Sequence, residues 1–368
     1  MELLIIVIII AAVVIAEQSL YSHIGTKHIS YSCGFETDII DEGGELSLTE
    51  TAVNRGVLPV PWMKAELTVP AAIEPVQGVS TVTDRDRFIT GFFVVRSRSR
   101  VTRVRKVRAL CRGVYRVTAA RVQTGDLLGG IRLSLSAEST GGKLTVLPVP
   151  AGCESVLNER LRRRSGERIV NRGLVTDPFY TSGARGYTQG DPLSRIHWKA
   201  TAHSGELMVR QEEWTAVPTL TIILNVQTDS ERAGKGADEE SLAEHTIRLC
   251  VQCIMEAMQE GYSVILRSNG FTSDEKPLYM TNRDAESMRY ALAELSVRSY
   301  QPFRQYMREL MDIPEDASCV LITPYTDDAH ESWKNSHPVS SVVVSGKGRD
   351  NAGIGDVLIP TAERSIEL

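Results

Sequence analysis

The sequence lacks the short motifs that mark several common active sites. It has no G-x-x-x-x-G-K-S/T loop to cradle nucleotide phosphates and no G-x-S-x-G elbow to present a nucleophilic serine. No two histidines stand four residues apart, as a helical metal pair requires. These absences argue against a P-loop nucleotide hydrolase, an esterase of the elbow type and a metalloprotease.

Excess positive charge and patterned cysteines are also missing. The net charge is −5 and aromatic residues make up 6%, a balance that excludes a general nucleic-acid binder. Only Cys250 and Cys253 form a C-x-x-C, and no second pair accompanies them. We interpret them as small residues of a helix in a reducing compartment, with zinc or redox use as the alternative.

One long apolar run is present, at the N-terminus. Leu3 to Ala16 is uninterrupted, and the helix can continue to Tyr21, close to the roughly 20 residues of a membrane span. Residues 1–21 are therefore predicted to be a retained transmembrane anchor. A cleaved signal peptide is the alternative, but no basic residue precedes the run. Lys27 follows the run, with His23 and His28, which favours a cytoplasmic location for the rest of the chain.

Residues 28–150 show the pattern of a β-sandwich, because short alternating runs are separated by closely spaced Gly and Pro turns. A basic cluster falls on these strands. We favour solvated strand faces for it, and contact with anionic lipid or an acidic partner is the alternative. The cluster comprises Arg96, Arg98, Arg100, Arg103, Arg105, Lys106, Arg108, Arg112 and Arg116.

Residues 151–215 form a connector with an unusual composition. A charged stretch, Cys153 to Phe179, precedes a run that has no helical or strand period. In that run Gly190 permits a sharp turn, and Asp191 is predicted to cap a helix over 194–202 that begins after Pro192 and ends near Gly205. Leu193, Ile196 and Ala200 would pack on one side of this helix.

Three interpretations of this run compete. We favour a structural connector with Trp198 as a buried wedge between two domains. The second is a docking surface or small-anion site made by basic side chains, and the third is a catalytic site using Asp191, Ser194 and His197, which lie too close in sequence for an ordinary triad. The candidate docking residues are Arg185, Tyr187, Gly190, Asp191, Pro192, Arg195, His197, Trp198, Lys199 and Gly205.

Residues 216–368 change to an α/β pattern. Thr219 to Val226 is a continuous apolar run typical of a buried parallel strand, and Glu239 to Gln259 has the period of a helix that Gly261 ends. Strands are predicted at 262–267, 319–323 and 339–344, and helices at 284–295 and 303–311. His330 and His337 are interpreted as isolated loop residues. The alternation predicts an open sheet with helices on both faces.

The order Y-x-x-G-D-P-x-x-x-I-H-W-K-A-T-A-x-x-G-E-L, beginning at Tyr187, resembles the signature of the bacterial family called domain of unknown function fifty-eight. The resemblance implies a von Willebrand factor A-like fold for the α/β domain. Metal-binding members of that fold carry D-x-S-x-S after the first strand, whereas this chain has Asn225, Gln227 and Asp229 there. Pro324 stands where a later loop would supply an acidic ligand. We therefore expect no metal, and a site rebuilt from Asp229 with Asp327 or Asp328 is the alternative.

Together these features predict an α+β multidomain chain with a transmembrane helix, an Ig-like β-sandwich and a C-terminal α/β domain. The function expected is a non-enzymatic, membrane-anchored adaptor that needs no cofactor. The resemblance implies a MoxR-type AAA+ ATPase and a transglutaminase-like membrane protein as partners, in the assembly or maturation of a complex. The alternatives are a hydrolase using Asp191 and His197, and a cell-surface adhesion module.

Overall fold

The chain divides into two compact units. The first contains Met1–Val149 together with Arg289–Leu295, and the second contains Pro150–Met288 and Ser296–Leu368. The computed structural model describes residues 2–24, 28–83, 85–117, 119–126, 132–137, 142–153, 155–157, 181–188, 191, 193–212, 218–228, 237–272, 276–282, 284–297, 299, 301–314, 317–325, 328–337, 341–344 and 357–358.

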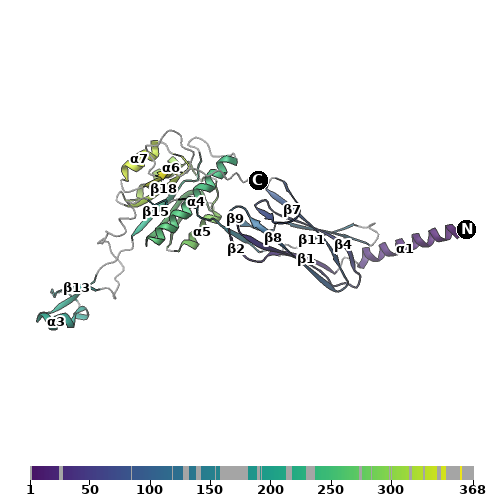
Figure 1. Cartoon of the computed structure of the whole chain (residues 1–368), viewed down its shortest axis with the longest axis horizontal. Coiled ribbons are helices and arrows are strands. Elements are labelled where there is room, and N and C mark those ends of the chain that lie inside the picture. Colours follow the sequence, from purple (N-terminus) through teal and green to yellow (C-terminus); the bar gives the residue numbers. More distant parts are fainter. Residues whose placement is uncertain are drawn as a thin grey trace. The chain divides into compact units, whose positions relative to one another are not determined.

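The first unit begins with helix α1 (Glu2–Ile24), shown in purple in Figure 1. Its segment Leu4–Tyr21 is long and apolar enough to cross a membrane, and almost none of it is buried. A signal sequence near the N-terminus passes the same test of length and apolar composition, so α1 counts only as a helix that suits a lipid environment. The predicted continuation of the helix to Tyr21 agrees with α1.

A β-sandwich follows, as predicted. One sheet has the order β1-β3-β8-β5 and the other β11-β10-β4-β7-β6, and a three-stranded sheet β2-β12-β9 adjoins them. Alternate residues of both large sheets, among them Leu48, Met63, Leu67 and Ile89, are fully buried in one core. The strands are β1 (Ile29–Phe35), β2 (Ile39–Asp41), β3 (Glu45–Asn54), β4 (Val60–Pro70), β5 (Ile73–Pro75), β6 (Ser80–Thr83), β7 (Asp86–Val95), β8 (Ser99–Ala109), β9 (Gly113–Tyr115), β10 (Ala119–Gly125), β11 (Arg132–Ala137) and β12 (Leu144–Leu147).

A charged group lies inside this sandwich. The Glu50 carboxylate has no exposed surface, accepts a hydrogen bond from Tyr31 Oη at 2.7 Å and pairs with Arg105 Nε at 2.8 Å. Burial, together with the Glu50 carboxylate, raises the pKa of the Tyr31 hydroxyl. Gly91 makes room for the cluster, because a Cβ there would meet Arg103 Nη1 at 2.9 Å.

The same two arginines cover an open strand edge. Strand β6 pairs with β7 only as far as Ile89, which leaves the later carbonyl groups of β7 without a strand partner on that side. Arg105 Nη2 donates to Thr90 O at 3.1 Å, and Arg103 Nη2 donates to Phe92 O at 2.5 Å. These guanidinium groups satisfy edge carbonyls that would otherwise offer themselves to another strand.

The second unit contains a six-stranded sheet in the order β17-β16-β15-β18-β19-β20, parallel except for β17. This is the doubly wound order in which the chain reverses direction beside its first strand. The predicted strands and helices of 216–344 are present, and β17 and α7 were not predicted. The elements are β15 (Thr219–Leu224), α4 (Ala237–Gln259), β16 (Ser263–Phe271), β17 (Pro277–Asn282), α6 (Phe303–Glu309), η2 (Leu310–Asp312), β18 (Ser318–Thr323), α7 (Asp328–Ser336), β19 (Ser341–Val344) and β20 (Val357–Leu358). Helix α5 (Ala285–Glu294) begins in this unit, and its residues from Arg289 onward belong to the first unit.

Helices cover both faces of this sheet. Helix α4 contacts β15, β16 and β18 on one face. On the other face Phe303 and Tyr306 of α6 and Trp333 of α7 pack with Ile223 and Leu321. The interpretation of His330 as a loop residue is wrong, whereas His337 lies outside the helices and strands, as predicted. His330 lies in α7, is 1% exposed and stacks on Phe303, and His337 directly follows α7 and is buried.

The C-x-x-C pair lies in the core. Cys250 and Cys253 of α4 have no exposed surface, and burial raises the pKa of both thiols, which keeps them protonated. The described residues contain no group of three or more His, Cys, Asp or Glu side chains that could hold a metal ion. Buried protonated thiols are poor metal ligands, so the geometry favours the reading as small helix residues.

Candidate functional site

The predicted signature run folds into a small module of its own. Strands β13 (Thr181–Gly186) and β14 (Met208–Glu212) form an antiparallel pair, and a 3-10 turn η1 (Leu193–Arg195) and helix α3 (Trp198–Ser204) connect them (Figure 1). Ile196 bridges to Val209, and both side chains are buried, which gives the module a minimal core. Neither strand was predicted, and most of the preceding charged stretch lies outside the described residues.

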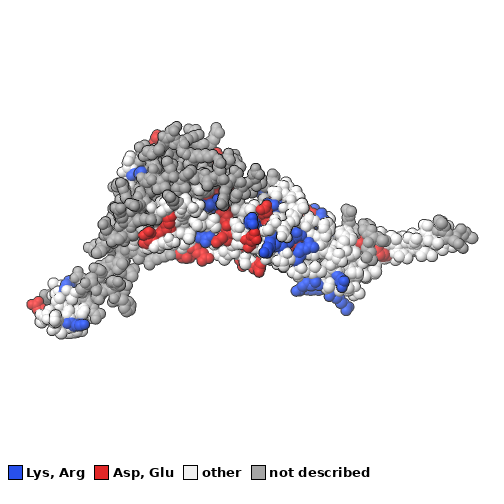
Figure 2. Space-filling view, viewed as in Figure 1, with Lys and Arg blue, Asp and Glu red and all other residues white. Residues whose placement is uncertain are grey.

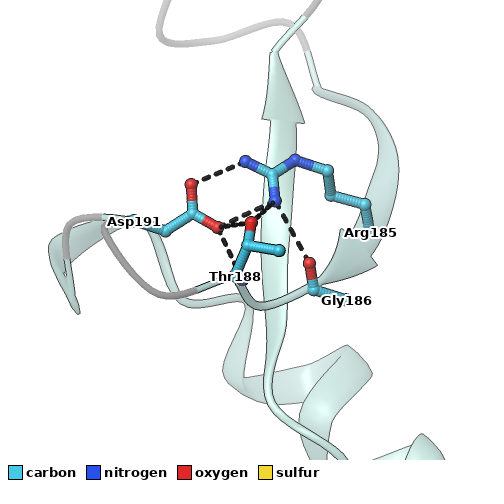
Figure 3. A network of polar contacts seen from close by, with 4 residues as sticks. All are labelled: Arg185, Gly186, Thr188 and Asp191. Carbon is cyan, nitrogen blue, oxygen red and sulfur yellow. Dashed lines mark hydrogen bonds and ion pairs between the residues drawn. The ribbon is translucent and has the colours of Figure 1, made fainter.

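The predicted role of Asp191 as a helix cap is wrong. Its carboxylate instead forms a two-point ion pair with Arg185, with Nη2 to Oδ1 at 2.6 Å and Nη1 to Oδ2 at 2.8 Å (Figure 3). Oδ2 also accepts from Thr188 N and Thr188 Oγ1, both at 2.9 Å. Arg185 Nη1 further donates to Thr188 Oγ1 and to Gly186 O. The Arg185–Asp191 pair, which we call the clamp, ties the end of β13 to the far end of the loop that follows it.

Arg185 cannot therefore serve as a free anion-binding fork, as the second interpretation requires. Its guanidinium is bound to Asp191, and this hydrogen bond holds the pKa of the Asp191 carboxyl well below its usual range. A carboxyl with a lowered pKa stabilises the folded state above its unfolded pKa and loses that contribution only as the pH falls through the lower folded value. The clamp should thus persist under conditions that protonate ordinary carboxylates.

Helix α3 begins later than predicted. His197 is its N-cap, and His197 Nδ1 accepts a hydrogen bond from Ala200 N at 3.1 Å. The helix ends at Ser204, and Gly205 takes the left-handed conformation with φ of +77°, as the predicted ending near Gly205 requires. His197 N also donates to Met208 O at 2.8 Å, which ties the start of the helix to β14.

The prediction of Trp198 as a buried wedge is also wrong. Trp198 is 68% exposed, and no residue of α3 is buried within the described structure. Leu193, which was expected to pack, is 68% exposed as well. Tyr187 is half-buried and Lys199 is exposed. Gly190, Pro192 and the side chain of Arg195 lie outside the residues whose surroundings are described.

Removing the clamp should loosen the loop without unfolding the protein. We expect Asp191→Asn to speed hydrogen exchange at the Thr188 amide severalfold, because that amide donates to the carboxylate. Arg185→Lys should do the same, since an ammonium cannot form the two-point pair. Thermal melting should stay unchanged, and Glu206→Gln is a matched exposed control. Unchanged exchange in both variants would show that the clamp does not order the loop.

A second polar group lies at the carboxyl ends of β15 and β18, where ligands bind in sheets of this order. Asn225 has no exposed surface. Its Oδ1 accepts from Gln227 N at 2.9 Å and from Asn269 Nδ2 at 3.0 Å, and its Nδ2 donates to Thr323 Oγ1 at 3.0 Å. Thr323 Oγ1 in turn donates to Tyr325 O at 2.7 Å.

Asn225 and Gln227, which stand where metal-binding members of the fold carry ligands, therefore form hydrogen bonds within the protein. Gln227 Oε1 accepts from Phe303 N at 2.8 Å, at the first residue of α6, and Val226 N donates to Asn269 Oδ1 at 2.9 Å. An amide with both of its polar atoms satisfied in this way acts as a structural tie between β15, β16 and β18. Asp229 and Asp327, the alternative ligands, lie outside the described residues, and Asp328 begins α7.

A scan of protein-family models and a search of curated proteins both find no match to this chain. Solved structures with a likeness to it include a non-cellulosomal cohesin from Archaeoglobus fulgidus, with 14% identity over 34% of this chain and 94% of that chain, at a TM-score of 0.23. The CARDB domain of a Pyrococcus furiosus protein, solved with di-metal ions, has 8% identity over 32% and 91%, at 0.22. Likenesses this weak carry no functional argument.

Proposed function

We propose that this chain is a non-enzymatic, membrane-anchored adaptor that docks a protein partner on the exposed face of its signature module. The observation that carries the proposal is the 68% exposure of Trp198. Tryptophan is among the residues that most often dominate binding energy at protein interfaces.

The surroundings of Trp198 support a docking role. Leu193 and Leu207 are also exposed apolar residues of the module, at 68% and 44%. The Arg185–Asp191 clamp orders the loop that leads to them, so less conformational entropy would be lost on binding. Exposed Lys199 stands next to Trp198 in sequence. The partner that fits is one with an apolar pocket and an acidic rim.

The arrangement of polar groups speaks against the hydrolase alternative. Asp191 is engaged by Arg185 and Thr188, and His197 Nδ1 is engaged by the backbone of Ala200. No hydrogen bond joins Asp191 to His197 in the described part of the chain. A catalytic dyad needs the acid to orient the histidine, and here each group is committed to a structural contact.

The remaining parts of the proposal come from the membrane-compatible helix and the resemblance of the signature. We propose that α1 is a retained anchor, that the soluble parts face the cytoplasm, and that the α/β domain is von Willebrand factor A-like and works without a metal. The doubly wound strand order and the mutually satisfied Asn225 group support this. The partner proposed is a MoxR-type AAA+ ATPase, with a transglutaminase-like membrane protein in the same complex.

Trp198→Ala is expected to weaken binding of the MoxR-type ATPase about 30-fold, the effect of removing an interface residue worth roughly 2 kcal/mol. Its melting temperature should not change, because exposed substitutions alter stability by less than about 0.5 kcal/mol. Purified full-length protein in detergent, titrated with the purified ATPase, provides the measurement. Val79→Ala, at a site 91% exposed on the sandwich, is the control. Equal binding by both variants would refute docking through Trp198.

A further inference from the structure

The structure divides the basic cluster of the sandwich into side chains with partners and side chains without. Arg103 and Arg105 cover the edge of β7, Arg108 pairs with Glu45 at 2.6 Å, and Arg112 donates to the carbonyl of Leu295 at 2.9 Å. The side chains of these arginines bind other groups of the protein. The arginines at the start of the cluster, Arg96, Arg98 and Arg100, do not form such ion pairs with described residues.

Four exposed arginines gather at one end of the sandwich. Arg96 and Arg98 lie in the turn between β7 and β8, Arg100 lies at the start of β8, and Arg55 lies in the loop after β3. No described acidic residue forms an ion pair with any of them. We call Arg55, Arg96, Arg98 and Arg100 the arginine collar. Figure 2 shows Lys and Arg side chains gathered on the sandwich near the end that α1 joins.

The two loops of the collar are built into one unit by Asn54. Its side chain is 2% exposed, donates to Leu58 O at 2.8 Å and to Arg96 O at 3.1 Å, and accepts from Gly56 N at 2.9 Å. Arg98 N and Ser97 Oγ both donate to Gly56 O at 3.1 Å. These hydrogen bonds hold the backbones of the two loops together, so the four arginines extend from one connected unit.

The backbone of Arg98 adopts a conformation that is unfavourable for arginine. Arg98 has a φ of +49°, and it is the one described residue other than glycine with a positive φ. Glycine or asparagine adopts this conformation at less cost than arginine. An arginine at this position places another cation at the tip of the turn.

The collar lies at the end of the sandwich that adjoins the apolar helix. Arg55 N donates to His28 O at 2.9 Å, and β1 begins at Ile29, soon after α1 ends at Ile24. Tyr21 of α1 donates from Oη to Pro59 O at 3.3 Å, in the same loop as Arg55. Val57, between them in sequence, is 67% exposed. The charges thus stand beside the point where the helix would leave a bilayer.

From this juxtaposition we infer that the arginine collar binds the anionic headgroups of the membrane that holds α1. Lys and Arg near an anionic bilayer surface each strengthen association about fivefold, and the effect disappears within a Debye length of the surface. Guanidinium groups also bind phosphate through two parallel hydrogen bonds. Val57 is placed to enter the headgroup region beside them. The collar would hold this end of the sandwich against the membrane surface.

This inference rests on the proposed retention of α1 as an anchor, and the experiment separates the two. The full-length protein is reconstituted into lipid discs of phosphatidylcholine, with or without phosphatidylglycerol. Hydrogen exchange is followed in the loops 55–59 and 96–99. We expect exchange in both loops to slow severalfold in the discs with phosphatidylglycerol, and this protection to disappear at high salt.

Two matched variants test the residues. Replacing all four collar arginines by glutamine, Arg55→Gln, Arg96→Gln, Arg98→Gln and Arg100→Gln, should abolish the protection. The same loss of charge through Arg85→Gln, Lys106→Gln, Arg116→Gln and Arg121→Gln, all exposed elsewhere on the sandwich, should leave it intact.

Three outcomes would overturn the inference. Equal exchange in neutral and anionic discs, with the protein still incorporated, would exclude headgroup binding and leave the anchor proposal standing. Protection by inorganic phosphate alone, in neutral discs, would indicate a soluble phosphate ligand in place of the membrane. Failure of the chain to remain in discs after carbonate treatment would exclude the anchor and the inference together.

Discussion

Replacing Arg105 with methionine is expected to lower the free energy of unfolding by about 3–5 kcal/mol, the typical cost of leaving a buried charge without its partner. Glu50 is fully buried, and its pair with Arg105 at 2.8 Å is the described contact that neutralises its charge. The substitution also removes the donor to Thr90 O at the open edge of β7. Chemical denaturation of the full-length protein in detergent gives the measurement.

Arg108→Met is the matched control, because Arg108 lies on the same strand and also pairs with a glutamate. The Arg108–Glu45 pair is exposed, with side chains 47% and 40% accessible, so its loss should cost between about 0 and 1 kcal/mol. The double variant Glu50→Leu/Arg105→Met should recover much of the lost stability, since no unpaired charge remains. Equal losses for Arg105→Met and Arg108→Met would show that the Glu50 pair contributes nothing special.

Asn225→Asp is expected to destabilise the α/β domain by about 3–5 kcal/mol at neutral pH, because it places a carboxylate in a fully buried position. The Asn225 Nδ2 donor to Thr323 Oγ1 is lost, and that hydroxyl already donates to Tyr325 O. Two acceptors would then face each other. The substitution introduces the acidic residue that the proposed von Willebrand factor A-like resemblance places here in metal-binding proteins, and so tests whether a metal site can be built at this position.

The pH dependence of this variant follows from the burial. A buried carboxyl has its pKa raised in the folded state, so the loss should be small below the unfolded pKa of about 3.9 and grow as the pH rises above it. Asn335→Asp, at an exposed position of α7, is the control and should show little effect. We expect Mg²⁺ to leave the melts of both the natural protein and Asn225→Asp unchanged. A saturable Mg²⁺-dependent recovery would support the rebuilt metal site.

Local periodicity was enough to predict most of the secondary structure of the two domains. Alternating runs within 28–150 predicted the strands of a sandwich, of which β3 is one, and the continuous apolar run 219–226 predicted a buried parallel strand. Strand β17 was missed because it lies at the edge of the sheet and has no apolar run of its own. Helix α7 was missed because its buried residues, His330 and Trp333, do not read as an aliphatic stripe.

The signature run shows where local rules gave the wrong contacts. The order Gly-Asp-Pro before a helical stretch favours Asp191 as a cap, but the carboxylate bonds backward to Arg185 across a strand pair that the sequence did not predict. His197 then caps the helix in its place. Once β13 and β14 are paired, Arg185 is held near Asp191, and a charge-assisted two-point pair is stronger than a bond to a backbone amide.

The sequence by itself determined which segments are apolar enough to form α1, the sandwich strands and the parallel sheet, because burial along one segment leaves a period in that segment. Only the tertiary structure decided which side chains of a given type are paired, buried or exposed. It paired Arg105 with the buried Glu50, left Arg98 exposed in a turn and exposed Trp198. These outcomes depend on contacts between residues distant in the chain, and no local period records such contacts.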